Sequence, residues 1–88
     1  MEIFLDDETG YAEWIAAHAT GWVLNVPRGK ARDALVLHRA TCGTISPAAG
    51  QHYTGPSYYK VCGPDRERLA HWAGWQHGEM SLCAVCRP

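Results

Sequence analysis

The chain has 88 residues, which is room for one compact domain but not for an enzyme with a separate cofactor lobe. Hydrophobic residues make up 47% and charged residues 19%, a composition typical of globular rather than disordered chains. The net charge is -1, yet five of the nine acidic residues fall within the first 13 positions, and all eight Lys and Arg come later. Because so small a core stabilises weakly, we expect residues 1–88 to form one domain stapled by a metal or a disulfide.

The N-terminal part of the chain predicts a strand followed by a helix. Residues 2–5 are predicted as the strand, and the polar residues 6–9 are suited to cap a helix and to its positive end. The helix should end near Gly21. Its buried face is predicted from residues spaced at i, i+3, i+4 and i+7, namely Tyr11, Trp14, Ile15 and His18.

Two short apolar runs follow the helix. Residues 22–26 and residues 34–38 are rich in strand-forming side chains, and the polar residues 28–33 separate them. This pattern predicts two antiparallel strands joined by a basic hairpin loop.

The second half of the chain predicts a loop, a strand and a helix before an irregular end. Residues 46–57 are rich in Pro and Gly and form the loop, and residues 58–62 form the strand. Residues 65–75 are predicted as the second helix, and residues 78–88 as irregular. The sequence therefore predicts an α+β domain with a short antiparallel sheet and two helices.

The strongest chemical signal is a pair of short metal-ligand spacings. His38 and Cys42 are separated by three residues, and Cys83 and Cys86 by two. A tetrahedral zinc ion takes four nitrogen or sulfur ligands, and two short pairs deliver them from two chain segments. We therefore predict that these four residues bind a structural Zn²⁺.

Cys62 provides an alternative fourth ligand. It is followed by glycine, as Cys42 is, and a Cys-Gly turn is common around metals. In this alternative the site has four cysteines and His38 lies beside it. We favour His38, because two paired elements close fewer long loops around the ion than single ligands do.

The segment from His38 to Cys42, followed by Cys83-Ala84-Val85-Cys86, resembles the small zinc-binding modules of the Ada type. The pattern of that family is Cys-or-His-x3-Cys and then Cys-x2-Cys, and such modules are associated with DNA proteins. The resemblance covers about half of the chain, with 40 residues between Cys42 and Cys83. The family's methyl-accepting cysteine occupies the first ligand position, which is His38 here, so the resemblance does not imply alkyl transfer.

The whole chain is also similar to a family of small bacterial proteins associated with modified-DNA binding and restriction. The similarity rests on Gly10-Tyr11-x-x-Trp14, Val23-Leu24-Asn25-Val26, Leu37-His38-Arg39-Ala40 and Lys60-Val61-Cys62. This resemblance implies DNA, including methylated DNA, as the partner.

The residues predict a binding protein rather than an enzyme. Arg39 and Ala40 follow His38, so the His-x-Glu motif of zinc deaminases is not formed, and four protein ligands leave no position for water. The chain also has no phosphate-binding glycine motif and no nucleophile elbow.

Basic and aromatic side chains are the candidates for contact with DNA. Guanidinium and ammonium groups neutralise phosphates, and five such residues are predicted to do so: Arg28, Lys30, Arg32, Arg39 and Lys60. Three aromatic residues are candidates to line a base pocket: Tyr58, Tyr59 and Trp75. The alternative function is a protein-interaction module, in which the zinc supports an exposed aromatic patch.

The location expected from the sequence is the cytoplasm, and the sequence leaves the oligomeric state undetermined. Residues 1–7 carry acid where a signal peptide carries lysine or arginine, and no stretch approaches the ~20 apolar residues of a membrane span. In a reducing compartment, four cysteines favour metal binding over disulfides.

Overall fold

The computed structural model describes residues 1–28, 35–48, 50–76 and 80–88. Within these residues two helices flank one five-stranded sheet, in which the strands lie in the order β1-β4-β2-β3-β5. The elements in chain order are β1 (Glu2–Phe4), α1 (Glu8–Ala17), β2 (Trp22–Pro27), β3 (Val36–Arg39), β4 (Tyr58–Gly63), α2 (Arg66–Gln76) and β5 (Ser81–Leu82). The predicted α+β class is confirmed.

Helix α1 begins where the acidic run predicts. Asp7 caps it by accepting a hydrogen bond from the Gly10 amide at 2.8 Å, and Tyr11 and Trp14 are buried. The prediction that His18 belongs to the buried face is wrong, because the helix ends at Ala17 and His18 is exposed beyond it. The His18 ring stacks on Trp14 with 4.4 Å between ring centroids.

Strand β2 is the centre of the sheet and pairs antiparallel with both β3 and β4. Its Val23 lies opposite His38 on one side and opposite Cys62 on the other. The predicted antiparallel pairing of the two apolar runs is therefore confirmed. The loop predicted between them falls largely on residues 29–34, which lie outside the described residues.

The C-terminal end of the chain is more regular than predicted, and the sheet is mixed rather than antiparallel. Strand β5 pairs in parallel with β3: the Ser81 amide donates to the Leu35 carbonyl at 2.9 Å and the Cys83 amide to the Leu37 carbonyl at 3.0 Å. Both residues of β5 are exposed, so no hydrophobic period marks this strand in the sequence. Its effect is to fix Cys83 beside the end of β3.

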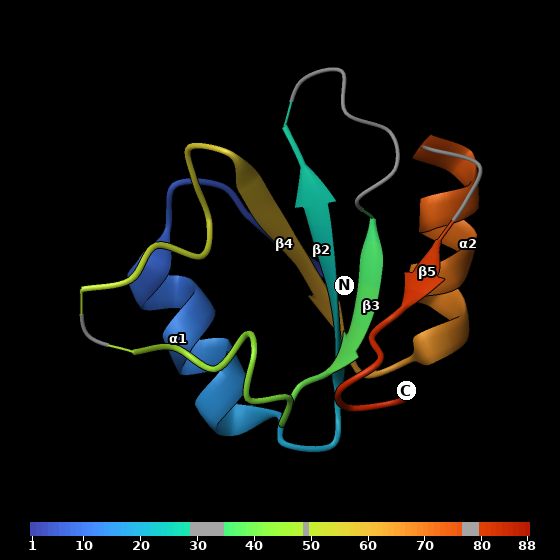
Figure 1. The fold of residues 1–88 in the computed structure, drawn as a ribbon, viewed down its shortest axis with the longest axis horizontal. Helices are drawn as coiled ribbons and strands as arrows, with labels where there is room; N and C mark the ends of the chain where they lie inside the picture. Colours follow the sequence, from blue (N-terminus) through green and yellow to red (C-terminus); the bar gives the residue numbers. More distant parts are fainter. Residues whose placement is uncertain (29–34, 49, 77–79) are drawn as a thin grey trace.

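The two faces of the sheet carry separate apolar clusters, because side chains alternate along each strand. Helices α1 and α2 lie on opposite sides of the sheet (Figure 1). The cluster on the α1 side includes Tyr11, Trp14, Val23, Cys42, Cys62 and Cys83. The cluster on the α2 side includes Leu24, Leu37, Val61, Leu69 and Ala73. Among the described residues, no helix is long and apolar enough to cross a membrane.

Candidate metal centre

The four predicted ligands meet at the end of β3. One donor atom from each residue lies within 4.8 Å of the donor atoms of the other three, and the group is His38, Cys42, Cys83 and Cys86. Three of them are buried and Cys86 is half-buried. The structure thus brings together two chain segments that are far apart in the sequence.

Local turns place both pairs. His38 is on β3, and the turn that follows is closed by a 2.9 Å hydrogen bond from the Cys42 amide to the Arg39 carbonyl. The Cys-x2-Cys pair lies on a second turn, closed by a 3.0 Å bond from the Arg87 amide to the Cys83 carbonyl. Each turn folds its two ligands to one side, and the parallel pairing of β5 with β3 brings the turns together.

The dimensions of the cluster suit a tetrahedral ion. Zinc–ligand bonds of about 2.0 to 2.3 Å place the donor atoms of a tetrahedral site about 3.3 to 3.8 Å apart. The Cys42 and Cys83 sulfurs are 3.9 Å apart, and the widest donor separation is at most 4.8 Å, so the atoms need to close by about 1.5 Å at most. The sulfurs are free thiols rather than a disulfide. The residues present therefore fit a metal ion of the zinc type.

Cys62 is not a member of this cluster. It faces the same side of the sheet as His38, but Val23 on β2 lies between them in the paired register. Two strand spacings separate β4 from β3, which is about 10 Å. Cys62 is fully buried in the α1-side core, and this burial raises the pKa of its thiol to about 12. The geometry thus favours His38 over Cys62 as the fourth ligand.

The surroundings of His38 and Cys83 favour the protonation states that bind metal, whereas burial raises the pKa of the Cys86 thiol. Burial lowers the pKa of His38, and the nearby Lys60 charge lowers it further, so the imidazole is held neutral. Hydrogen bonds from the backbone amide of Cys86 and then of Val85 lower the pKa of the Cys83 thiol. Metals bind neutral imidazole and thiolate, so both effects reduce competition by protons.

Thr44 is a neighbour of the cluster that the sequence patterns do not identify. Its hydroxyl lies 3.0 Å from the Cys42 sulfur and 3.4 Å from Nδ1 of His38. A hydroxyl here can donate to a ligating sulfur, and such outer contacts orient metal ligands. No motif marks Thr44, because its role depends on the turn that brings it back over Cys42.

Lys60 does not lie on the surface, which corrects its predicted role in phosphate contact. Only 3% of this residue is exposed, and its ammonium donates to Oδ1 of Asn25 at 2.6 Å and to the Tyr53 carbonyl at 2.5 Å. Burial lowers the pKa of Lys60 to about 8. The side chain stabilises the loop over the α1 side of the sheet and is not available to DNA.

The basic residues of the predicted hairpin divide into two groups. Arg28 is engaged within the domain, because its guanidinium forms a 3.1 Å ion pair with Asp6 and donates to the Thr54 carbonyl at 2.7 Å. These contacts compensate part of its charge within the domain, and its predicted contact with phosphate stays a prediction. Lys30 and Arg32 lie outside the described residues. Arg39 is exposed, but its side chain contacts the second metal-ligand turn.

The three candidate aromatic residues differ in exposure. Trp75, on α2, is 80% exposed, and Tyr58, at the start of β4, is 39% exposed. Tyr59 is half-buried and packs against the α2-side cluster, where burial raises the pKa of its hydroxyl. Trp75 and Tyr58 are therefore available to a partner, whereas Tyr59 is largely part of the core.

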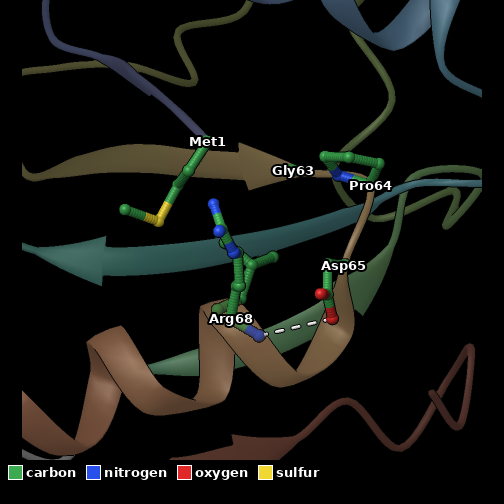
Figure 2. A pocket seen from close by; sticks show the side chains of 6 residues that line it. Met1, Gly63, Pro64, Asp65 and Arg68 are labelled. Atoms are coloured by element: carbon green, nitrogen blue, oxygen red, sulfur yellow. Dashed lines mark hydrogen bonds between the residues drawn. The ribbon is translucent and has the colours of Figure 1, made fainter.

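A separate hollow lies between the N-terminus and the first turn of α2. It has a volume of about 320 Å³ and is lined by Met1, Gly63, Pro64, Asp65, Arg68 and Leu69. Figure 2 shows the Arg68 side chain extending across it toward Met1. Among the described residues, none of the predicted metal ligands or DNA-contacting residues lines it.

Comparison with protein-family models, curated proteins and solved structures finds no match for this chain. The group of four donor residues and the surface around it are therefore the features from which a function can be inferred.

Proposed function

We propose that the domain is a binding module stabilised by one structural Zn²⁺, held by His38, Cys42, Cys83 and Cys86. The observation that carries this proposal is the convergence of four donor atoms within 4.8 Å. Four protein ligands complete a tetrahedral zinc shell and leave no position for a reacting water, so the proposed role is structural and not catalytic. In its ligand order the site follows the Ada-type pattern of His or Cys, then Cys, then Cys-x2-Cys.

The zinc proposal is tested by removing the metal. Zinc-loaded protein should lose one equivalent of zinc to a strong chelator and melt at a lower temperature afterwards, and added zinc should restore the melting temperature. Cobalt substitution should give the intense visible bands of a tetrahedral thiolate site. A protein whose melting is unchanged by chelator would contradict the proposal.

We propose DNA as the partner, including DNA with a methylated base. Support comes from the basic composition of residues 28–32, of which Lys30 and Arg32 remain candidates for phosphate contact, and from the exposed ring of Trp75. An exposed tryptophan offers a face on which a base can stack. The resemblance to modified-DNA-binding proteins points to the same class of partner.

Arg28 is unsuitable as a test variant for DNA binding, because it forms an ion pair within the domain. Replacing Arg28 would remove its contacts with Asp6 and Thr54 and change stability, so the informative variant is Lys30→Ala with Arg32→Ala. This variant should weaken binding to a duplex, and wild-type affinity should fall steeply between 50 and 200 mM salt, as is typical of phosphate contacts. A comparison of plain and methylated duplexes tests base recognition. Unchanged affinity in the double variant would contradict the hairpin as the contact surface.

A protein-interaction module is the second candidate, and the 80% exposure of Trp75 favours it. An aromatic protein interface depends weakly on salt, whereas phosphate binding depends on it strongly. If the domain binds its partner with an affinity that does not respond to salt, and Trp75→Ala abolishes this binding, a protein partner is favoured over DNA.

A further inference from the structure

Residues 86–88, which begin with the second cysteine of the Cys-x2-Cys turn, are held by arginine side chains rather than by a regular element. The Arg39 guanidinium donates from Nε to the Cys86 carbonyl and from Nη2 to the Arg87 carbonyl, both at 3.1 Å. Nη2 of Arg66 donates to the Pro88 carbonyl at 3.4 Å. Three consecutive carbonyls thus each accept a hydrogen bond from an arginine.

A shared aromatic ring orders the two arginines. Trp22 and Arg39 are cross-strand partners on β2 and β3, and the Arg39 guanidinium carbon lies 5.3 Å from the centre of the Trp22 ring. Arg66, in the first turn of α2, approaches the same ring at 5.8 Å. Cations are attracted to an indole ring, so Trp22 fixes both guanidinium groups beside the end of the chain.

The same strand also touches the metal ligand itself. The backbone amide of Arg39 donates to the Cys86 sulfur at 3.2 Å, so one residue contacts both the sulfur and the carbonyl of Cys86. Arg87 adopts a left-handed backbone conformation with φ of 49°, which non-glycine residues rarely do. The arginine contacts thus reach a turn that carries a left-handed residue next to the half-buried Cys86.

We propose that Arg39 is a positioning residue for the metal centre and that Arg39 and Arg66, ordered by Trp22, form an arginine clasp on residues 86–88. The clasp holds the Cys86 sulfur at the site. Arg39 contributes most to the clasp, because its side chain makes two hydrogen bonds. A zinc ion with three thiolates and a neutral histidine has a net charge of -1, and the Arg39 guanidinium compensates it. This inference rests on the proposed zinc site and assigns Arg39 a role inside the domain.

The test measures the reactivity of individual cysteines in the zinc-loaded full chain. Cys86 and Cys62 are alkylated with N-ethylmaleimide and quantified by peptide mass spectrometry. Cys62 is fully buried in the core, so its labelling reports global unfolding, while labelling of Cys86 reports local release from the metal. Comparing both rates with zinc and with chelator separates a positioning role at the metal, which shows only with zinc, from a merely structural one, which shows in both.

Arg39→Gln should raise the labelling rate of Cys86 about tenfold and weaken zinc binding about 10- to 100-fold, and because zinc binding is coupled to folding the labelling of Cys62 should rise as well in the zinc-loaded chain. Arg39→Lys should fall between wild type and Arg39→Gln, because an ammonium cannot reproduce the two-pronged contact. Arg68→Gln is the matched control, since Arg68 lies on the same helix as Arg66 but lines the hollow beside Met1 (Figure 2). It should behave as wild type.

Equal labelling of Cys86 in wild type and Arg39→Gln, or a rise of Cys62 labelling in the variant that is as large with chelator as with zinc, would overturn the clasp. If Arg39→Gln does not fold, Arg66→Gln decides in the same way, with a smaller expected rise because it removes one hydrogen bond. Zinc content is measured first on wild type. A wild type that cannot hold zinc removes the proposed function and the clasp with it, whereas a loaded wild type with an unaffected Arg39→Gln variant removes the clasp alone.

Discussion

Two buried cysteines on the same side of the sheet offer a matched test of the metal centre. Cys42 and Cys62 are 3% and 0% exposed and belong to the same apolar cluster, but only Cys42 is in the donor group. Cys42→Ser removes a proposed ligand, and Cys62→Ser makes the same chemical change outside the site. Both place a hydroxyl in the core, so the cost of that hydroxyl is common to the two variants.

The expected difference between the variants follows from the coupling of zinc binding to folding. Zinc at 100 times its dissociation constant stabilises the folded state by about 2.7 kcal/mol. In a domain of this size each 1 kcal/mol shifts the melting temperature by roughly 4 to 8 °C, so chelation should lower it by roughly 10 to 20 °C. Cys62→Ser should start from a lower melting temperature, since burying a hydroxyl costs about 1 to 3 kcal/mol, but should lose the same amount on chelation.

The assay is thermal unfolding of wild type and both variants, each with zinc and with excess chelator. Wild type and Cys62→Ser should show the full chelator-induced decrease, and Cys42→Ser only a small one. Equal decreases in the two variants would refute the assignment of Cys42. A decrease that is lost in Cys62→Ser and kept in a His38→Ala variant would instead identify the four-cysteine site.

Two further predictions concern the polar contacts beneath the loop on the α1 side of the sheet. Burial lowers the pKa of Lys60 to about 8, so between pH 8 and its ordinary value of 10.5 the unfolded chain binds more protons than the folded one. In urea titrations, the free energy of unfolding of wild type should therefore rise by about 1 kcal/mol relative to that of Lys60→Met between pH 8 and 9. The same dependence of this free energy on pH in both proteins would contradict the prediction. The Glu8 carboxylate accepts hydrogen bonds from Thr54 and Tyr53, which outweigh its burial and lower its pKa. Glu8→Gln should lower the free energy of unfolding by about 1 to 3 kcal/mol at pH 7. Below the lowered pKa of Glu8 the loss should be much smaller, because protonation of the wild-type carboxylate removes the same contacts. A loss that does not depend on pH would exclude this role.

The ligand set was predictable because each half of it is local. The spacings of His38 with Cys42 and of Cys83 with Cys86 are visible in the sequence, and each corresponds to one turn. The choice between His38 and Cys62 depended on sheet register, which places Val23 between them. Single-sequence patterns carry little information about that register.

The roles of the basic residues were less predictable, because pairing over long sequence distances decides them. Lys60 faces Asn25 across β4 and β2 and lies under the Tyr53 carbonyl, while Arg28 meets Asp6 from the start of the chain. Strand β5 was not predicted, for a related reason. It has two exposed residues and forms by pairing with β3, so neither hydrophobic period nor length marks it.

X-ray absorption of the zinc-loaded protein tests the central claim most directly, because it counts the atoms bound to the ion. The arrangement of His38, Cys42, Cys83 and Cys86 predicts three sulfurs at about 2.3 Å and one imidazole nitrogen at about 2.0 Å, with no bound water. Four sulfurs would place Cys62 at the metal, and a shell that includes water oxygen would mean an open site; either result would contradict the structural centre described above.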